Sequence, residues 1–143
     1  MAVSAKIYGL FYTSLANKEM NLSSDTLKCL LCTASYTPNQ DTHRYKADLT
    51  NEVTGTGYTA GGVALTGVTL SYDTASNTFK LDSNDPAWAS STITARYAVF
   101  YDDTPATNKP LISYVDLDGN ISSTNSTFTV QLDANGIINL TAA

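Results

Sequence analysis

The sequence is poor in charge, and above all in positive charge. Six lysines and two arginines are scattered over 143 residues without a basic run, and the net charge is −5. Nucleic-acid binding needs clustered Lys and Arg to neutralise phosphates, so this composition argues against a nucleic-acid partner. The mild acidic excess mainly favours solubility.

Long apolar runs are also missing. No stretch approaches the 18 apolar residues that indicate a membrane-spanning helix, so no membrane association is expected. Residues 1–15 contain Lys6 and a short apolar patch, without the longer apolar region or the small-residue cleavage site of a signal peptide. We therefore expect the chain to stay in the cytoplasm of the cell that makes it, where its cysteines remain reduced.

Cysteine and histidine are too few for the usual metal and redox sites. A structural zinc site uses four ligands, whereas this chain has a single C-x-x-C, formed by Cys29 and Cys32, and one histidine, His43. A redox C-x-x-C opens a helix, but this one lies in an apolar run of strand length, where positions i and i+3 face opposite sides. We predict that both thiols are buried core residues and that His43 lies at the surface or in an interface.

Motifs for catalysis and for nucleotide binding are absent or incomplete. There is no G-x-S-x-G and no Walker loop, although residues 55–60, GTGYTA, match a relaxed dinucleotide fingerprint. Such a loop follows a buried strand and opens a helix, whereas polar residues precede this one and β-branched residues follow it. We predict that the glycines permit positive φ, bulges or close backbone approach, in a loop adaptable enough to lie across a neighbouring subunit. The sequence thus predicts no cofactor and no enzymatic activity.

The residues that are abundant favour strands and turns. Threonine occurs 21 times, serine 14 times and asparagine 11 times, and 11 of the 13 acidic residues are aspartate. Thr and Tyr favour strands, whereas Asp, Asn, Ser and Gly favour turns. Glu, Lys, Arg and Gln, the usual surface residues of helices, are scarce. The composition therefore predicts an all-β chain.

Short apolar runs between turn residues predict seven to nine strands. One hairpin is expected from residues 63–72 and 78–81, and another from residues 128–132 and the run after Asn135-Gly136, the commonest signal for a two-residue primed turn. Further strands are expected at residues 6–12, continuing into a short irregular or helical piece, and at 26–33, 93–101 and 111–117, with a helical turn within 42–49. This pattern predicts an antiparallel β-sandwich or barrel with long irregular loops and at most one or two short helices. We expect residues 1–143 to form one domain, in which residues 1–25 either fold onto the body or reach to a neighbour.

Three further features, namely the acidic segments, Trp88 and Arg96, are expected to have structural roles. The acidic segments 82–85, 102–103 and 116–120 are expected to form Asx turns, with a weak calcium site in one of them as the alternative. Trp88 is expected in the core beside a turn, with an exposed anchor as the alternative. Arg96 lies in the strongest predicted strand, so its guanidinium must reach solvent or pair with an aspartate, because a buried unpaired charge is too costly.

Three stretches carry a resemblance to a known family: LCTASYTPNQDTHRY (31–45), NEVTGTGYTAGG (51–62) and ITARYAVFYDD (93–103). Together they resemble a family of small virion-associated proteins encoded in the structural gene blocks of tailed bacteriophages and prophages. The match covers most of the chain. The family pattern is more acidic near residues 44–49, where this chain has RYKADL, so a partner surface there would differ.

The resemblance implies a structural role on the virion and supplies no catalytic residues. The first expectation is capsid decoration, as a cement protein on the outer surface of the major capsid protein lattice, made in the host bacterial cytoplasm. The alternative is a tail or head–tail connector component, such as a tube or terminator subunit. A homotrimer would suit the three-fold positions of a capsid. The residues alone leave a third hypothesis, a carbohydrate-binding β-sandwich in which Trp88 and exposed tyrosines form a stacking platform.

Two long irregular loops, residues 34–62 and 102–110, are expected to carry the contacts, because such loops in a compact domain are usually functional or disordered. Tyr and Arg are the side chains most enriched at interface anchor positions. The predicted interface residues are Tyr36, Pro38, His43, Arg44, Tyr45 and Tyr58.

Overall fold

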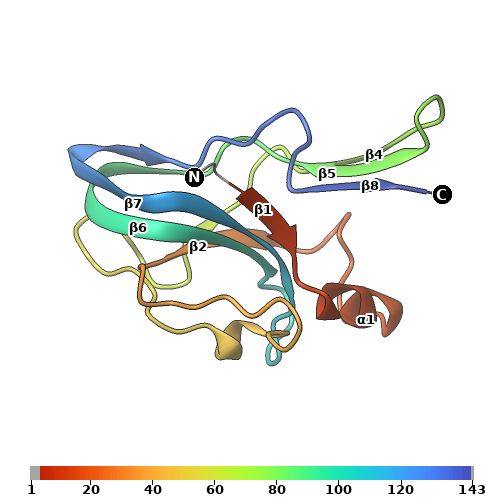
Figure 1. Ribbon diagram of the computed structural model, residues 1–143, viewed down its shortest axis with the longest axis horizontal. Helices are drawn as coiled ribbons and strands as arrows, with labels where there is room; N and C mark the ends of the chain where they lie inside the picture. Colours follow the sequence, from red (N-terminus) through yellow and green to blue (C-terminus); the bar gives the residue numbers. More distant parts are fainter. Residues whose placement is uncertain (1–3, 143) are drawn as a thin grey trace.

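The chain folds into two antiparallel β-sheets that pack against each other (Figure 1). The computed structural model describes residues 4–142. The larger sheet has the strand order β1-β7-β6-β2-β3 and the smaller one the order β4-β5-β8. The strands are β1 (Ser4–Ile7), β2 (Leu27–Cys32), β3 (Val63–Ala64), β4 (Thr69–Asp73), β5 (Thr78–Asp82), β6 (Ala87–Asp102), β7 (Leu111–Thr129) and β8 (Ile138–Thr141). The predicted all-β sandwich is thereby confirmed.

Two short helical elements accompany the sheets. They are the α-helix α1 (Leu10–Ala16) and the 3₁₀ turn η1 (Lys46–Asp48), the latter inside the segment where a helical turn is predicted. No helix in the described part of the chain is long and apolar enough to cross a membrane.

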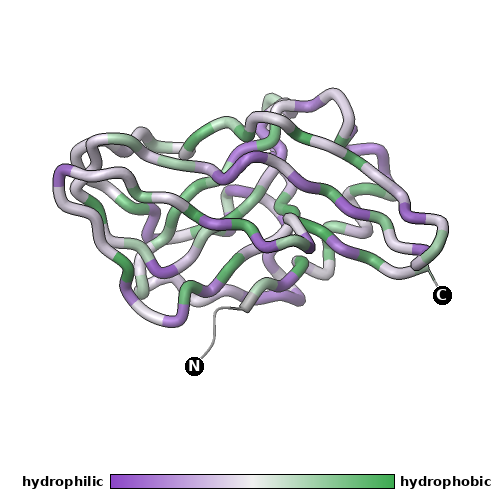
Figure 2. Tube along the Cα trace, turned by 90° about the horizontal axis from the view of Figure 1, so that it is seen from above, coloured by the Kyte–Doolittle hydropathy of each residue, from purple (hydrophilic) through white to green (hydrophobic). Residues whose placement is uncertain are grey.

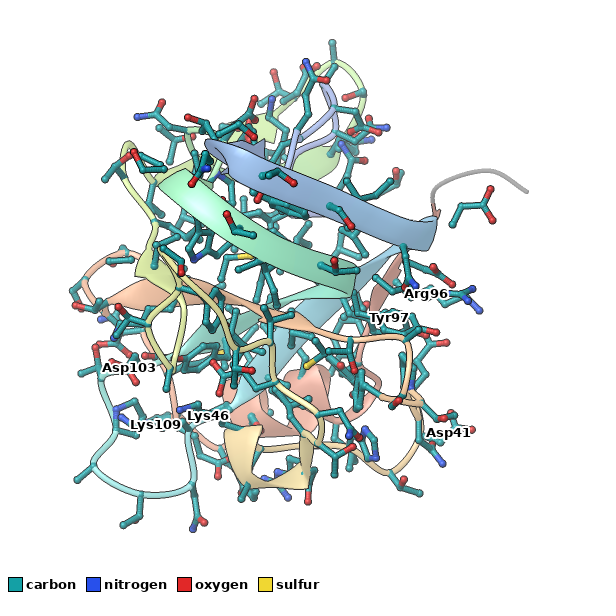
Figure 3. The ribbon with its side chains drawn as sticks, turned by 90° about the vertical axis from the view of Figure 1, so that its left-hand side faces the viewer. Asp41, Lys46, Arg96, Tyr97, Asp103 and Lys109 are labelled. Carbon is teal, nitrogen blue, oxygen red and sulfur yellow. The ribbon has the colours of Figure 1, made fainter. Side chains whose placement is uncertain are left out.

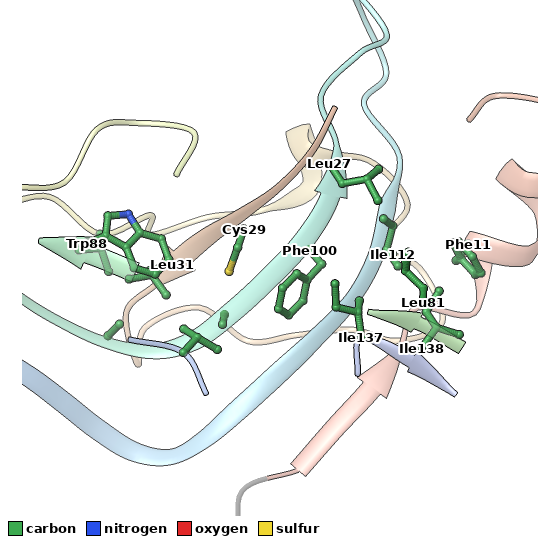
Figure 4. Packing of buried hydrophobic residues seen from close by; sticks show 14 of the residues in the cluster. Phe11, Leu27, Cys29, Leu31, Leu81, Trp88, Phe100, Ile112, Ile137 and Ile138 are labelled. Carbon is green, nitrogen blue, oxygen red and sulfur yellow. The ribbon is translucent and has the colours of Figure 1, made fainter. Parts of the chain in front are cut away.

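The main core lies between the two sheets (Figure 4). Leu81 and Ile138 of the smaller sheet pack in one cluster with Cys29 and Phe100 of the larger sheet. Side chains alternate along a strand, so Cys32, three residues after Cys29, joins a second cluster on the opposite face. Both cysteines are fully buried, as the sequence predicts.

The second face of the larger sheet is covered by the loop 33–49 and not by another sheet. The cluster beneath this loop is rich in tyrosine and comprises Tyr8, Leu30, Cys32, Tyr36, Tyr97, Val99, Tyr101, Leu111 and Tyr114. Because both faces of the sheet are covered here, β2 and the end of β6 are nearly continuous apolar runs. Strands with an exposed face instead alternate apolar and polar residues, which Figure 2 shows along the chain trace.

The glycine-rich loop 55–62 lies against the chain's own strands. A Cβ on Gly57 would come within 2.8 Å of Ser91 Cα, and one on Gly62 within 1.9 Å of the Cys29 carbonyl oxygen. Both glycines have positive φ, 80° and 78°. The prediction that these glycines permit positive φ and close backbone approach is confirmed.

Strand β7 is longer than the sequence predicts. Separate strands are expected at residues 111–117 and 128–132, whereas β7 continues from Leu111 to Thr129 without reversing and pairs with β6. The turn residues between them produce a bulge, in which Asp118 and Gly119 have φ of 64° and 130° and the register with β6 shifts. Asp116 accepts a hydrogen bond from the Asp118 N–H, so the predicted Asx turn is present within a strand.

The predicted C-terminal hairpin is wrong, and the turn there spans residues 133–136 instead of being a primed turn centred on Asn135-Gly136. Gly136 has φ of 69°, and its N–H donates to the Asp133 carbonyl. Before this turn, Phe128 still pairs with β6, whereas β8 pairs with β5 in the other sheet. The chain therefore crosses between the two sheets where the sequence predicts adjacent strands.

The other predicted hairpin is confirmed in a shorter form. Strands β4 and β5 pair antiparallel, but residues 63–72 do not form one strand. Val63–Ala64 instead pairs with β2, and Gly67, with φ of 61°, lies between the two parts. A positive φ interrupts the extended backbone, so the run is divided between two sheets.

Residues 4–25 pack against the body of the chain. Strand β1 pairs with β7 and ends at Ile7, earlier than the strand predicted over residues 6–12. The Gly9 N–H then donates to the Gln40 carbonyl, and α1 begins at Leu10. Residues 1–3 of the predicted arm lie outside the described residues.

Candidate interaction surface

The structure divides the six predicted interface residues between two regions. Five belong to the loop 33–49 that covers the larger sheet, whereas Tyr58 belongs to the glycine-rich loop. Apart from Tyr36, which is buried, the other five are half-buried, so each also contacts its own chain.

Tyr36 does not fit the expectation of a surface anchor, because only 1% of the residue is exposed. Its hydroxyl forms hydrogen bonds with the Tyr8 hydroxyl at 2.9 Å and with His43 Nδ1 at 2.8 Å. Its ring stacks on His43 and meets Tyr97 edge-on. Burial raises the pKa of Tyr36 to about 12, so the phenol stays neutral near pH 7. Tyr36 therefore anchors its own loop to the sheet.

Arg44 and Tyr45 bind a carboxylate of the same chain. Arg44 Nη2 and the Tyr45 hydroxyl each lie 2.6 Å from an oxygen of Glu19, and Arg44 Nε donates to Ser14 Oγ of α1 at 3.1 Å. The Arg44 guanidinium also lies over the Tyr45 ring. These contacts attach α1 and the residues after it to the loop 33–49. The half-exposed parts of Pro38, His43, Arg44 and Tyr45 stay a predicted contact region.

Glu19→Gln is expected to destabilise the fold in a pH-dependent way. The hydrogen bonds from Tyr45 and Arg44 lower the pKa of Glu19, so their stabilisation is present above the ordinary Glu value and is lost as pH falls through the lowered one. We expect the variant to melt about 1–3 °C below the wild type at pH 7 and the gap to close below about pH 4. Asp41→Asn, at an exposed site in the loop 33–49, is the control and should leave Tm unchanged at both pH values. A gap that persists in acid would contradict the ionic origin of the effect.

Tyr58 supports the chain's own core. Its ring stacks on Trp88 with a centroid distance of 6.0 Å, and its hydroxyl donates to Glu52 Oε1 and accepts from the Leu31 N–H. Trp88 is 3% exposed, which agrees with the predicted core position. Trp88 is therefore not available as the exposed stacking residue that the carbohydrate-binding hypothesis assigns to it.

Several charged side chains in and beside the larger sheet form ion pairs, among them Arg96, Asp103 and Lys109, which are labelled in Figure 3. Arg96 Nε lies 3.1 Å from Asp116 Oδ1, which is one of the two arrangements expected for this arginine. Asp103 lies 2.9 Å from Lys28 and 3.1 Å from Lys109. Among residues 4–142, no group of three or more His, Cys, Asp or Glu side chains could hold a metal ion.

A different surface, formed by α1 and β4, carries exposed apolar side chains. Tyr12 and Leu15 project from α1, and Leu70 and Tyr72 from β4, each 39–52% exposed. An open groove of about 640 Å³ separates the helix and the residues after it from the smaller sheet. Leu15, Met20 and Leu22 line it from one side, and Leu70 and Phe79 from the other. We call this feature the α1–β4 groove.

The apolar face of the smaller sheet leads from the core into the α1–β4 groove. Leu70 lies opposite Leu81, and Tyr72 lies opposite Phe79, so all four side chains share one face. Leu81 is fully buried, Phe79 half-buried and Tyr72 52% exposed. Within the described residues β4 has β5 as its one strand neighbour, so it forms an edge of this sheet. The groove wall is thus a direct extension of the rigid core.

Sequence reasoning did not identify the α1–β4 groove. The alternation of Leu70 and Tyr72 with polar residues is visible in the sequence and indicates a strand with one apolar face. Whether other elements cover that face depends on α1, β4 and the residues before β2, which are far apart in the chain. No local pattern reports this arrangement.

Comparison of the chain with protein-family models, with curated proteins and with solved structures finds no match.

Proposed function

We propose that this protein is a non-enzymatic structural protein of a tailed-phage virion that decorates the outer surface of the capsid, and that it docks there through the α1–β4 groove. The observation that carries the proposal is the apolar face of the smaller sheet, which continues out of the core and ends at exposed Leu70 and Tyr72. Contiguous apolar patches on a protein surface mark interaction sites, because burying them removes apolar area from water.

The rest of the molecule suits a docking role. The loop 33–49 is anchored by Tyr36 and by the Arg44–Glu19 pair, so the body presents its surface with little conformational cost on binding. The proposed partner is the major capsid protein, and a homotrimer on the capsid three-folds is the proposed assembly. The resemblance of residues 31–45, 51–62 and 93–103 to virion proteins supports this choice of partner.

A tail or head–tail connector role is the second candidate, and the β4–β5 hairpin favours it. A tube subunit needs an exposed hairpin for stacking between rings, and all five residues of β4 are exposed. Negative-stain imaging of particles that carry a labelled copy separates the two candidates. Label over the whole head in hundreds of copies supports decoration, whereas label confined to the tail or neck supports the second candidate.

Leu70→Thr combined with Tyr72→Thr is expected to weaken capsid binding at least tenfold. Burying one such side chain is worth about 1.5–3 kcal/mol, and 1.4 kcal/mol corresponds to a factor of ten in Kd. The measurement is co-sedimentation of the purified protein with phage heads that lack it. Ile121→Thr, at an apolar side chain on β7 that is 47% exposed, is the matched control and should bind like the wild type. Equal binding by all three proteins would remove the groove from the docking surface.

A further inference from the structure

A buried carboxyl group, that of Asp102, lies close to Asp25, one of the residues that line the α1–β4 groove. Asp102 ends β6 and is fully buried, whereas Asp25 is half-buried, lines the groove and lies two residues before β2. Leu27 pairs with Asp102 and the Asp103 N–H donates to the Thr26 carbonyl, so Asp25 and Asp102 are diagonal neighbours on the same face of the two chains. This arrangement joins the end of a core strand to residues 17–25, the segment that forms one wall of the groove.

The hydrogen bonding of this pair is incomplete. Asp102 Oδ1 accepts from the Thr104 N–H at 2.9 Å, which is the predicted Asx turn, but Asp102 Oδ2 is buried without a partner. Asp25 Oδ2 accepts from the Asn21 N–H at 2.7 Å. A buried oxygen without a hydrogen bond is costly, and two adjacent carboxylates disfavour each other's ionisation.

Two lysines close to Asp102 are directed to another acid. Lys28 and Lys109 both bind Asp103, the residue after Asp102. On the groove side, Lys18 and Glu19 line the wall together with Asp25, and Glu19 is bound by Arg44. A proton on Asp102 would turn the carboxyl group into a hydrogen-bond donor and would remove a buried negative charge beside Asp25.

We propose that the buried Asp102 carboxyl group holds a proton, and that this proton stabilises the packing of residues 17–25 against the end of β6. Above neutral pH Asp102 loses the proton and becomes a buried charge, and residues 17–25 loosen. A resulting pH dependence of docking rests on the proposed function, whereas the proton site itself does not.

The folded state therefore holds a proton that the unfolded chain gives up. Burial, and then the contact with Asp25, raise the pKa of Asp102 to about 7 from an ordinary value of 3.8. Between these two values the unfolded state binds fewer protons than the folded state, so stability falls as pH rises from about 4 to about 7 and is level above.

Asp102→Asn removes the group whose titration lowers the stability as pH rises, so this variant is the direct test of the proton site. The amide has the shape of the carboxyl group and can donate a hydrogen bond at every pH. We expect its Tm to equal that of the wild type near pH 4 and to exceed it by about 5–10 °C at pH 8. Equal Tm values at pH 8, or an Asp102 carboxyl carbon that titrates below pH 5 by NMR, would overturn the proposal. Should Asp102→Asn not fold, the NMR titration of Asp102 in the wild type provides the test.

Asp103→Asn is the matched control on the next residue. Burial alone would raise the pKa of Asp103, but the hydrogen bonds from Lys28 and Lys109 outweigh it and lower the pKa. Stabilisation from this group is present at pH 8 and is lost in acid, so the variant should melt below the wild type at pH 8 and approach it near pH 3. The two neighbouring substitutions thus have opposite signs.

Two further measurements test whether the site binds calcium instead of a proton and whether the proton affects docking. Millimolar calcium at pH 8 should not raise the Tm of the wild type; a rise that Asp102→Asn abolishes would identify a metal site and overturn the proton site. Binding to phage heads should weaken between pH 6 and pH 8 for the wild type and stay constant for Asp102→Asn. Equal pH dependence in both proteins would overturn the coupling to docking, and no binding at either pH would instead contradict the proposed function.

Discussion

Gly62→Ala is expected to cost at least about 4 kcal/mol of folding free energy, the range reached only by severe structural disruption. The added Cβ would lie 1.9 Å from the Cys29 carbonyl oxygen and 2.7 Å from Leu30 Cα, both backbone atoms of the interior strand β2. Neither can move without disturbing the pairing of β2 with β6. The φ of 78° adds the strain that a left-handed conformation imposes on an L-residue. Urea unfolding followed by far-UV circular dichroism measures the loss.

Gly119→Ala separates the clash from the φ strain. Gly119 also has positive φ, 130°, but a Cβ there would meet no atom within 4 Å. Its substitution should cost about 1–2 kcal/mol, the strain alone. Similar losses in the two variants would show that the backbone conformation dominates and that the loop 55–62 can move away from β2.

Trp88→Ala is expected to cost about 4 kcal/mol, because a buried aromatic side chain is replaced by a cavity. Trp88 stacks on Tyr58 and meets Phe128 edge-on with a centroid distance of 6.1 Å. These contacts hold the glycine-rich loop against the β6–β7 ribbon. Urea unfolding followed by circular dichroism gives the free energy, since the variant lacks tryptophan fluorescence.

Trp88→Phe should cost only about 1 kcal/mol. A phenyl ring keeps most of the apolar volume, and the indole N–H that it removes is buried without a hydrogen-bond partner. No hydrogen bond is therefore lost with the indole. A loss as large as that of Trp88→Ala would mean that the N–H has a partner in solution.

The sequence predicts the fold class and its most apolar strands correctly. Residues 26–33 and 93–101 are dense in apolar side chains because both faces of β2 and of the end of β6 are covered. The burial of Cys29 and Cys32 on opposite faces of the larger sheet follows from the same strand geometry, since positions i and i+3 point to opposite faces. A strand that is covered on both faces needs apolar residues at nearly every position, so this burial can be recognised from the local sequence.

The polar half of β7 is not predictable in this way. Residues 118–127 read as a turn, because Asp118 and Gly119 favour positive φ and the following residues are mostly Ser, Thr and Asn. In the structure their hydroxyls pair across the strands, as between Thr94 and Ser122 at 2.7 Å. The partners lie 28 residues apart, and a local pattern cannot distinguish a bulge that continues a strand from a turn that reverses it.

The predicted interface residues show a similar limit. Composition identifies Tyr and Arg as anchors, yet Tyr36 is used for internal packing and Arg44 binds Glu19 across 25 residues of sequence. The α1–β4 groove arises where three distant segments leave an apolar face uncovered. Residue type indicates what a side chain can contact, whereas only the tertiary arrangement determines whether it is left free to do so.

The burial of both thiols has a practical consequence for chemical labelling. Burial raises the pKa of Cys29, and burial together with the Glu52 carboxylate raises that of Cys32 to about 12. Maleimides and iodoacetamides react with the thiolate, so the native chain should remain unmodified under the usual conditions near pH 7. A cysteine introduced at Ile121 would then be the single reactive position, and a fluorophore or gold cluster attached there would report where each copy is located without removal of either native residue.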